Sequence, residues 1–145
     1  MNDTVQLLQD VVRNARTGRD AVEQLMEKTG GDMKAELRRE RETYIHAQKE
    51  SEQALSDAGG RAEPTGPMAR AGMWMGLQME TLTDRSDSHI AEILIQGATM
   101  GVIEMTKALN TYGDADPSAR DLANRFVTRQ NEAIERQKGF LRNGE

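Results

Sequence analysis

Hydrophobic residues recur every three or four positions along most of the chain. Near the amino terminus this spacing gives the stripe Leu8, Val11, Ala15, Val22 and Leu25. Residues spaced in this way share one face of an α-helix, whereas a half-buried strand would alternate with a period of two. Similar stripes follow in four further segments, and alternation is nearly missing. The pattern therefore predicts an all-α protein.

Glycine, proline and short polar side chains mark the ends of these segments. The only long connector is "GGRAEPTGP", and prolines 67 and 117 suit the first position of a helix, where their missing N–H would be unpaired anyway. The candidate N-terminal caps are Asn2 or Asp3 for the first helix, Asp32 for the second, Ser86, Asp87 or Ser88 for the fourth, and Asp116 for the fifth. The 145 residues are expected to form one domain. Its predicted helices span residues 3–29, 32–58, 67–82, 87–112 and 117–141.

The third predicted helix is apolar on two sides. One stripe includes Met75 and Met79, and a second contains Met73, Trp74 and Leu77. A helix of this kind is either covered on both sides within its own fold or shared with a partner. The first interpretation has it cross the fold with its second side partly covered. The second makes Met73/Trp74/Leu77 the interface of a homodimer.

The helix "MARAGMWMGLQMETLTD" followed by "SHIAEILIQGATMGVIEMTKAL" resembles bacterial four-helix proteins of the ferritin-like superfamily that are classified only as domains of unknown function. The order of the elements, two helices, a connecting helix and two more helices, is similar as well. The resemblance implies an antiparallel four-helix bundle with an additional crossover helix between bundle helices two and three. It also raises the question of iron, because well-known members of that superfamily bind two iron ions.

Those members take a Glu from each of two helices and a Glu-x-x-His from each of the other two. In this chain His46 follows Glu42 by four positions, and His89 precedes Glu92 by three, which inverts the motif. No residue matches the di-iron pattern, so neither a catalytic residue nor a metal ligand is assigned and no cofactor is expected. Iron or manganese remains the cofactor of the alternative interpretation.

A few polar residues nevertheless fall on inward stripes. Glu40, Tyr44, Glu104 and Gln130 are candidates for a small polar pocket, with Gln137 nearby, which could bind a small ligand or a single cation. The simpler interpretation is that each glutamate lies at the edge of its stripe or contacts a cation or a tyrosine hydroxyl, because an unpaired buried carboxylate is costly. The proposed partners are Arg19, Arg41, Lys107 and tyrosine.

Glycines 97 and 101 lie one helical turn apart in the most apolar run of the chain. Small residues at this spacing let two helices approach closely. We expect them to pack against a neighbouring helix, with Tyr44 as a candidate contact.

Composition and charge argue against several classes of function. The net charge of −5 and the interleaved acidic and basic residues argue against nucleic-acid binding. No cysteine is present, and no segment resembles a signal peptide or a membrane span, so a cytoplasmic protein is expected. The predicted role is structural or protein-binding rather than enzymatic. The alternative is a metal- or small-ligand-binding ferritin-like protein with residual oxidase or metal-storage activity.

Overall fold

The computed structural model describes residues 2–62 and 70–143, and this part of the chain is all-α. It contains five helices and no strand: α1 (Asp3–Met26), α2 (Gly31–Asp57), α3 (Arg70–Glu80), α4 (Asp87–Thr111) and α5 (Pro117–Lys138). The all-α prediction is thus confirmed. The predicted start of the third helix at residue 67 lies outside the described residues.

Two of the expected caps are present. The Asn2 side-chain oxygen accepts a hydrogen bond from the Val5 N–H at 2.8 Å, and Ser86 Oγ accepts one from the His89 N–H at 3.2 Å. The expectation for Asp32 was wrong, because Gly30 caps α2 and Asp32 lies in its first turn. There its carboxylate is still favourably placed, since the positive end of the helix dipole attracts an anion.

The end of α2 depends on a left-handed glycine. Gly59 has a φ of 80°, its N–H donates to the Ser56 carbonyl, and the Gly60 N–H donates to the Leu55 carbonyl. This pair of hydrogen bonds is the Schellman arrangement, which satisfies the last carbonyls of a helix. It stops α2 and turns the chain back along the molecule.

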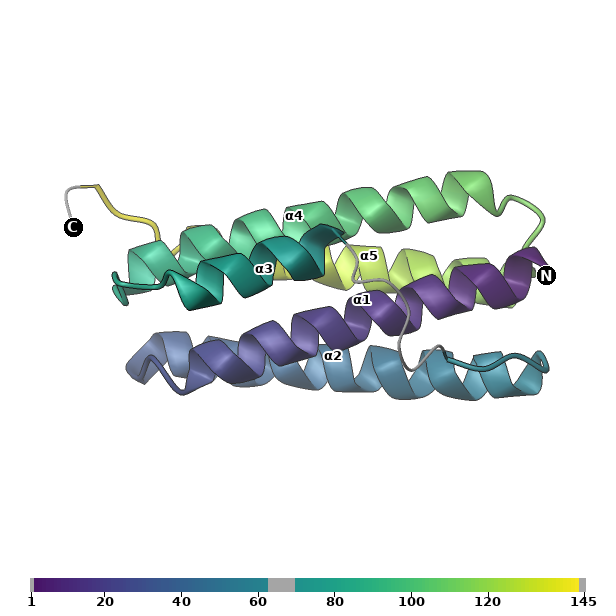
Figure 1. Ribbon diagram of the computed structural model, residues 1–145, viewed down its shortest axis with the longest axis horizontal. Helices are drawn as coiled ribbons and strands as arrows, with labels where there is room; N and C mark the ends of the chain where they lie inside the picture. The colour runs from purple at the N-terminus through teal and green to yellow at the C-terminus, as the bar shows by residue number, and fades with distance from the viewer. Residues whose placement is uncertain (1, 63–69, 144–145) are drawn as a thin grey trace.

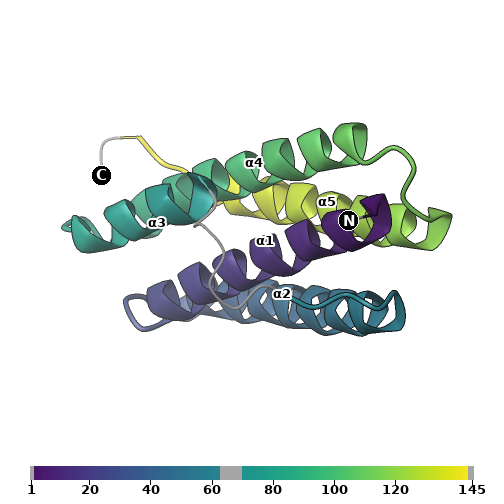
Figure 2. The ribbon, with the colours of Figure 1, turned by 45° about the vertical axis from the view of Figure 1, so that its right-hand side comes forward.

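The four long helices lie side by side, and the shorter α3 lies alongside α4 (Figure 1). Helices α1 and α2 form one antiparallel pair, and α4 and α5 form the other. Because α2 and α4 run in the same direction, the chain must return along the length of the molecule between them. Helix α3 forms the last part of this return (Figure 2).

Small residues allow close packing at the centre of the fold. A Cβ added to Gly18 would lie 2.3 Å from the Tyr44 ring, and one added to Gly97 would lie 2.3 Å from the Met75 methyl group. The predicted contact between Tyr44 and the α4 glycines was therefore wrong: the tyrosine lies over Gly18 of α1. Gly97 instead accommodates Met75 of α3.

Candidate functional site

Glu40 lies at the centre of the fold, with only 3% of its surface exposed. Helix α2 turns this side chain towards α5, where Gln137 Nε2 donates a hydrogen bond to Glu40 Oε2 at 2.7 Å. The expected edge position and the expected cationic or tyrosine partner were therefore wrong. The partner is a neutral amide that is itself 1% exposed.

A second carboxylate lies one turn earlier on α2. Glu36 accepts hydrogen bonds from Arg136 Nε at both of its oxygens, at 2.9 and 3.0 Å, and it also shares a hydrogen bond with Glu40. Burial, together with this hydrogen bond to Glu36, raises the pKa of Glu40 to about 9, although Gln137 and Arg136 act in the opposite direction. At neutral pH the Glu40 carboxyl therefore keeps its proton.

Tyr44 continues this polar layer one turn further along α2. Its side chain is 7% exposed, and its ring meets Phe126 edge to face, with ring centroids 6.1 Å apart. Burial and the neighbouring Glu40 raise the pKa of the Tyr44 hydroxyl above its ordinary value, opposed by a hydrogen bond from Gln130. The phenol is therefore neutral and anchored by both packing and a hydrogen bond.

A small cavity of about 30 Å³ lies beside these side chains. Glu40, Tyr44 and Gln130 line it, so the structure brings together three of the four predicted pocket residues. Glu104 is not among the lining residues and is half-buried on α4. Sequence reasoning missed Asn14, which lines the cavity from α1; its position on a buried stripe was the available signal.

The cavity does not have the ligands of a di-iron centre. Within residues 2–62 and 70–143, no three His, Cys, Asp or Glu side chains converge. His46 is 78% exposed and pairs with Glu50 at 3.1 Å, and His89 lies 3.6 Å from Glu92. Neither imidazole points into the polar layer that contains Glu40 and Tyr44.

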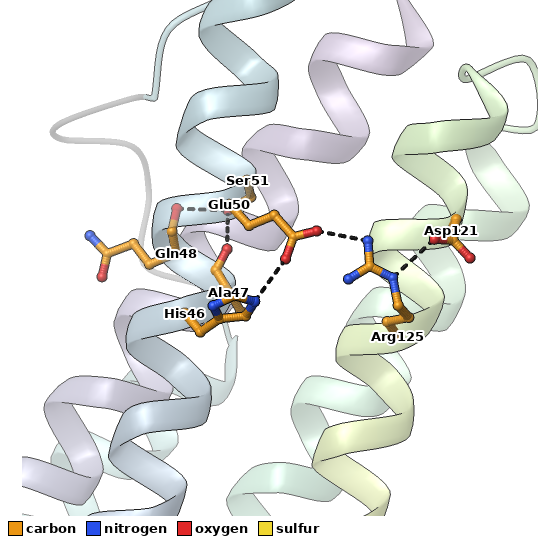
Figure 3. Close-up of polar contacts among 7 residues, drawn as sticks. All are labelled: His46, Ala47, Gln48, Glu50, Ser51, Asp121 and Arg125. Atoms are coloured by element: carbon orange, nitrogen blue, oxygen red, sulfur yellow. Dashed lines mark hydrogen bonds and ion pairs between the residues drawn. The ribbon is translucent and has the colours of Figure 1, made fainter.

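A shallow groove of about 250 Å³ separates α2 from α5. On its rim, Arg125 donates to Asp121 on its own helix and to Glu50 on α2 at 2.7 Å, and Glu50 also contacts His46 (Figure 3). Arg125 lowers the pKa of Glu50 below its usual value, mainly through their hydrogen bond. The pairs within each helix could be predicted from their spacing of four, but the bond between the helices could not.

This rim is expected to contribute little to stability. Replacing Arg125 with methionine should lower the free energy of unfolding by less than about 1 kcal/mol, because solvent screens ion pairs between exposed side chains. The loss should shrink further in 1 M salt. Urea unfolding of the two proteins at low and high salt measures it, and a loss of several kcal/mol would show that the pair holds the helices together.

The outer face of α3 carries exposed apolar side chains. Met73 is 63% exposed and Leu77 is 55% exposed, one turn apart on the same side. Trp74 is only half-exposed and packs against the core, with its ring 3.5 Å from the position of a Gly97 Cβ. The predicted Met73/Trp74/Leu77 face therefore consists of Met73 and Leu77, because Trp74 turns inward.

Comparisons with protein-family models, curated proteins and solved structures gave no match for this chain. In the described part of the chain, no helix has the length and apolar character needed to cross a bilayer.

Proposed function

We propose that this protein is a ferritin-like four-helix bundle that binds another protein and has no di-iron activity. The element order supports the ferritin-like assignment, as do the shared direction of α2 and α4 and the position of α3 on the return between them. In this proposal the bundle is a rigid scaffold, and residues on its surface bind the partner.

The chemistry of the central layer supports the second part of this proposal. A di-iron centre needs several carboxylates and imidazoles that reach the same point. Among the residues that line the cavity, Glu40 is the one carboxyl; the phenol of Tyr44 and the amide of Gln130 line it as well, and the amide of Gln137 donates to Glu40. Gln137 donates to Glu40 and Gln130 forms a hydrogen bond with Tyr44, and uncharged groups of this kind are poor ligands for iron.

The exposed pair on α3 is the observation that carries the protein-binding role. Isolated exposed apolar residues are common, but Met73 and Leu77 are both exposed one turn apart on the same side of one short helix, and we call this pair the α3 strip. Gly76 lies between them, and a Cβ added there would meet nothing within 4 Å. A partner helix could therefore approach the α3 backbone closely, and the flexible methionine would adapt to it.

A second copy of this chain is the partner that we propose. A strip on a single exposed helix can pair with itself across a two-fold axis, so that each copy buries the same residues. The two α3 helices would then cross near Gly76, with Met73 of one copy near Leu77 of the other.

Light scattering and sedimentation of the purified protein test this interface. We expect a dimer that becomes a monomer when Leu77 is replaced with glutamate, because a charge would be buried at the contact. Ile103→Glu is the matched control: Ile103 is 49% exposed and lies on α4 and not on α3, so its replacement should leave the dimer intact. A native protein that is monomeric at high micromolar concentration would refute the proposal.

The alternative function is a metal- or small-ligand-binding ferritin-like protein with residual oxidase or metal-storage activity. The cavity beside Glu40 is the observation that favours it, because polar side chains from α1, α2 and α5 line it. Iron-dependent oxygen consumption by the purified protein would support this function over the first.

A further inference from the structure

Methionine is the only sulfur-containing residue of this protein. The chain holds nine methionines and no cysteine. Cysteine thiolates and methionine thioethers are the sulfur groups that peroxides oxidise. Because no thiol is present to react with the oxidant, the methionine thioethers are the sites that remain for this reaction.

Exposure to solvent distinguishes one methionine from the others. Among the methionines that the structure describes, Met73 is the one on the surface, with 63% of its area exposed. Met75 is only 8% exposed, and Met33 and Met105 are fully buried. The remaining described methionines are half-buried: Met26, Met79 and Met100. Since a peroxide reaches the sulfur through water, we expect Met73 to react first among them.

Met73 is also one of the two residues of the α3 strip. Oxidation converts its apolar thioether into a polar sulfoxide, whose oxygen accepts hydrogen bonds. In the proposed dimer this oxygen would face Leu77 of the second copy near Gly76, and neither of these residues has a side-chain donor for it. An acceptor that is buried without a donor is costly, and the two-fold axis imposes that cost once for each copy.

We propose that Met73 is an oxidation site that controls dimerisation, an inference that rests on the proposed function. The oxidant is a hydroperoxide, of which H₂O₂ is the simplest. The lone pair of Met73 Sδ attacks one peroxide oxygen, and an S–O bond forms as the O–O bond breaks. The hydroxide that leaves takes the proton from the new S–OH group and becomes water. The sulfur loses two electrons, and the peroxide gains them.

The dimer and the oxidised side chain oppose each other. Met73 is exposed in the monomer and covered in the proposed dimer, so the peroxide reacts with the monomer. The sulfoxide then weakens reassociation, and the population moves towards monomer by mass action. A methionine sulfoxide reductase, which converts the sulfoxide back to the thioether, would restore the dimer.

Treatment of the purified protein with H₂O₂ tests this switch. Peptide mass spectrometry locates the sulfoxide, and sedimentation velocity measures the dimer. We expect Met73 to be oxidised before the half-buried methionines. Once it is oxidised, the dissociation constant of the dimer should rise by about 10-fold or more. Treatment with methionine sulfoxide reductase should reverse this rise.

Two leucine variants separate Met73 from the other methionines. Met73→Leu keeps an apolar side chain on the α3 strip without a sulfur atom, so its dimer should persist in peroxide. Met79→Leu is the matched control: Met79 lies on the same helix but packs against the core, so this dimer should still dissociate on oxidation. In the native protein, the rate constant for Met73 oxidation should fall as the protein concentration rises, because the dimer covers the sulfur.

A dimer that persists with Met73 fully oxidised would overturn the proposal. Dissociation of the Met73→Leu dimer by peroxide would also overturn it, because another group would then be responsible, as would oxidation of Met79 ahead of Met73. A protein that is monomeric before peroxide is added refutes the proposed dimer, and the switch with it. The untreated sample therefore distinguishes the two failures.

Discussion

Replacing Glu40 with glutamine is expected to stabilise the protein by about 5 kcal/mol at pH 8. Glutamine has the shape of the protonated carboxyl. Its oxygen can accept from Gln137 and its amide can donate to Glu36, so the hydrogen bonds of the buried layer are kept. What is removed is the cost of taking up a proton on folding. Urea unfolding of the two proteins at pH 8 measures the difference.

The pH dependence has a definite sign. The pKa of Glu40 is near 4.5 in the unfolded chain and is raised to about 9 in the folded protein. Between these values the folded state holds an extra proton, so stability is greatest below pH 4.5 and falls as the pH rises towards 9, by up to about 1.4 kcal/mol per pH unit. Glu40→Gln removes this slope.

The exposed Glu42→Gln change is the control for the loss of one carboxylate. It should leave both the stability and its pH dependence within about 0.5 kcal/mol of the native protein. The free energies of unfolding of the native and Glu40→Gln proteins should therefore diverge from pH 5 to pH 9. A constant difference would contradict this prediction, because it would show that folding does not change the proton occupancy of Glu40.

Gly18→Ala is expected to destabilise the protein by about 2 kcal/mol, although alanine in a helix interior normally stabilises. The added Cβ would lie 2.3 Å from the Tyr44 ring. That ring cannot move away easily, because it is buried and packed edge to face against Phe126. Either α1 separates from α2 or the tyrosine leaves its position.

The test of this clash is a double-mutant cycle. In a Tyr44→Leu background the ring atoms are gone, so adding Gly18→Ala should cost little or even stabilise the helix. Chemical unfolding of the four proteins gives the coupling energy. An equal loss in both backgrounds would show that the alanine disturbs something other than Tyr44.

The helices and their inner faces could be predicted because both are encoded by spacing along one segment. This spacing predicts that Glu40 and Gln130 lie on inward stripes, and both are buried. The partner of Glu40 could not be predicted, because it depends on how α2 is shifted along α5. No pattern within a single helix contains that shift, so the sequence predicts Gln137 only as a nearby residue and does not predict that Arg136 pairs with Glu36.

The angular position of a residue around its helix explains two other differences between the sequence predictions and the structure. Successive helical residues are about 100° apart, so Trp74 can point inward while Met73 faces outward. The sequence pattern assigns both residues to one apolar stripe because both are large and apolar. Glu104 was placed on the inner stripe of α4, but it lies half-buried and away from the cavity. A carboxylate at a stripe edge can turn outward by a small rotation of the helix.

We propose that the middle of this protein is a hydrogen-bonded polar layer and not a di-iron centre. Metal analysis by mass spectrometry, on protein purified from an iron-supplemented culture, tests it most directly. We predict far less than one iron or manganese ion per chain after gel filtration. Two iron ions retained per chain would contradict the claim and would favour the metal-binding alternative.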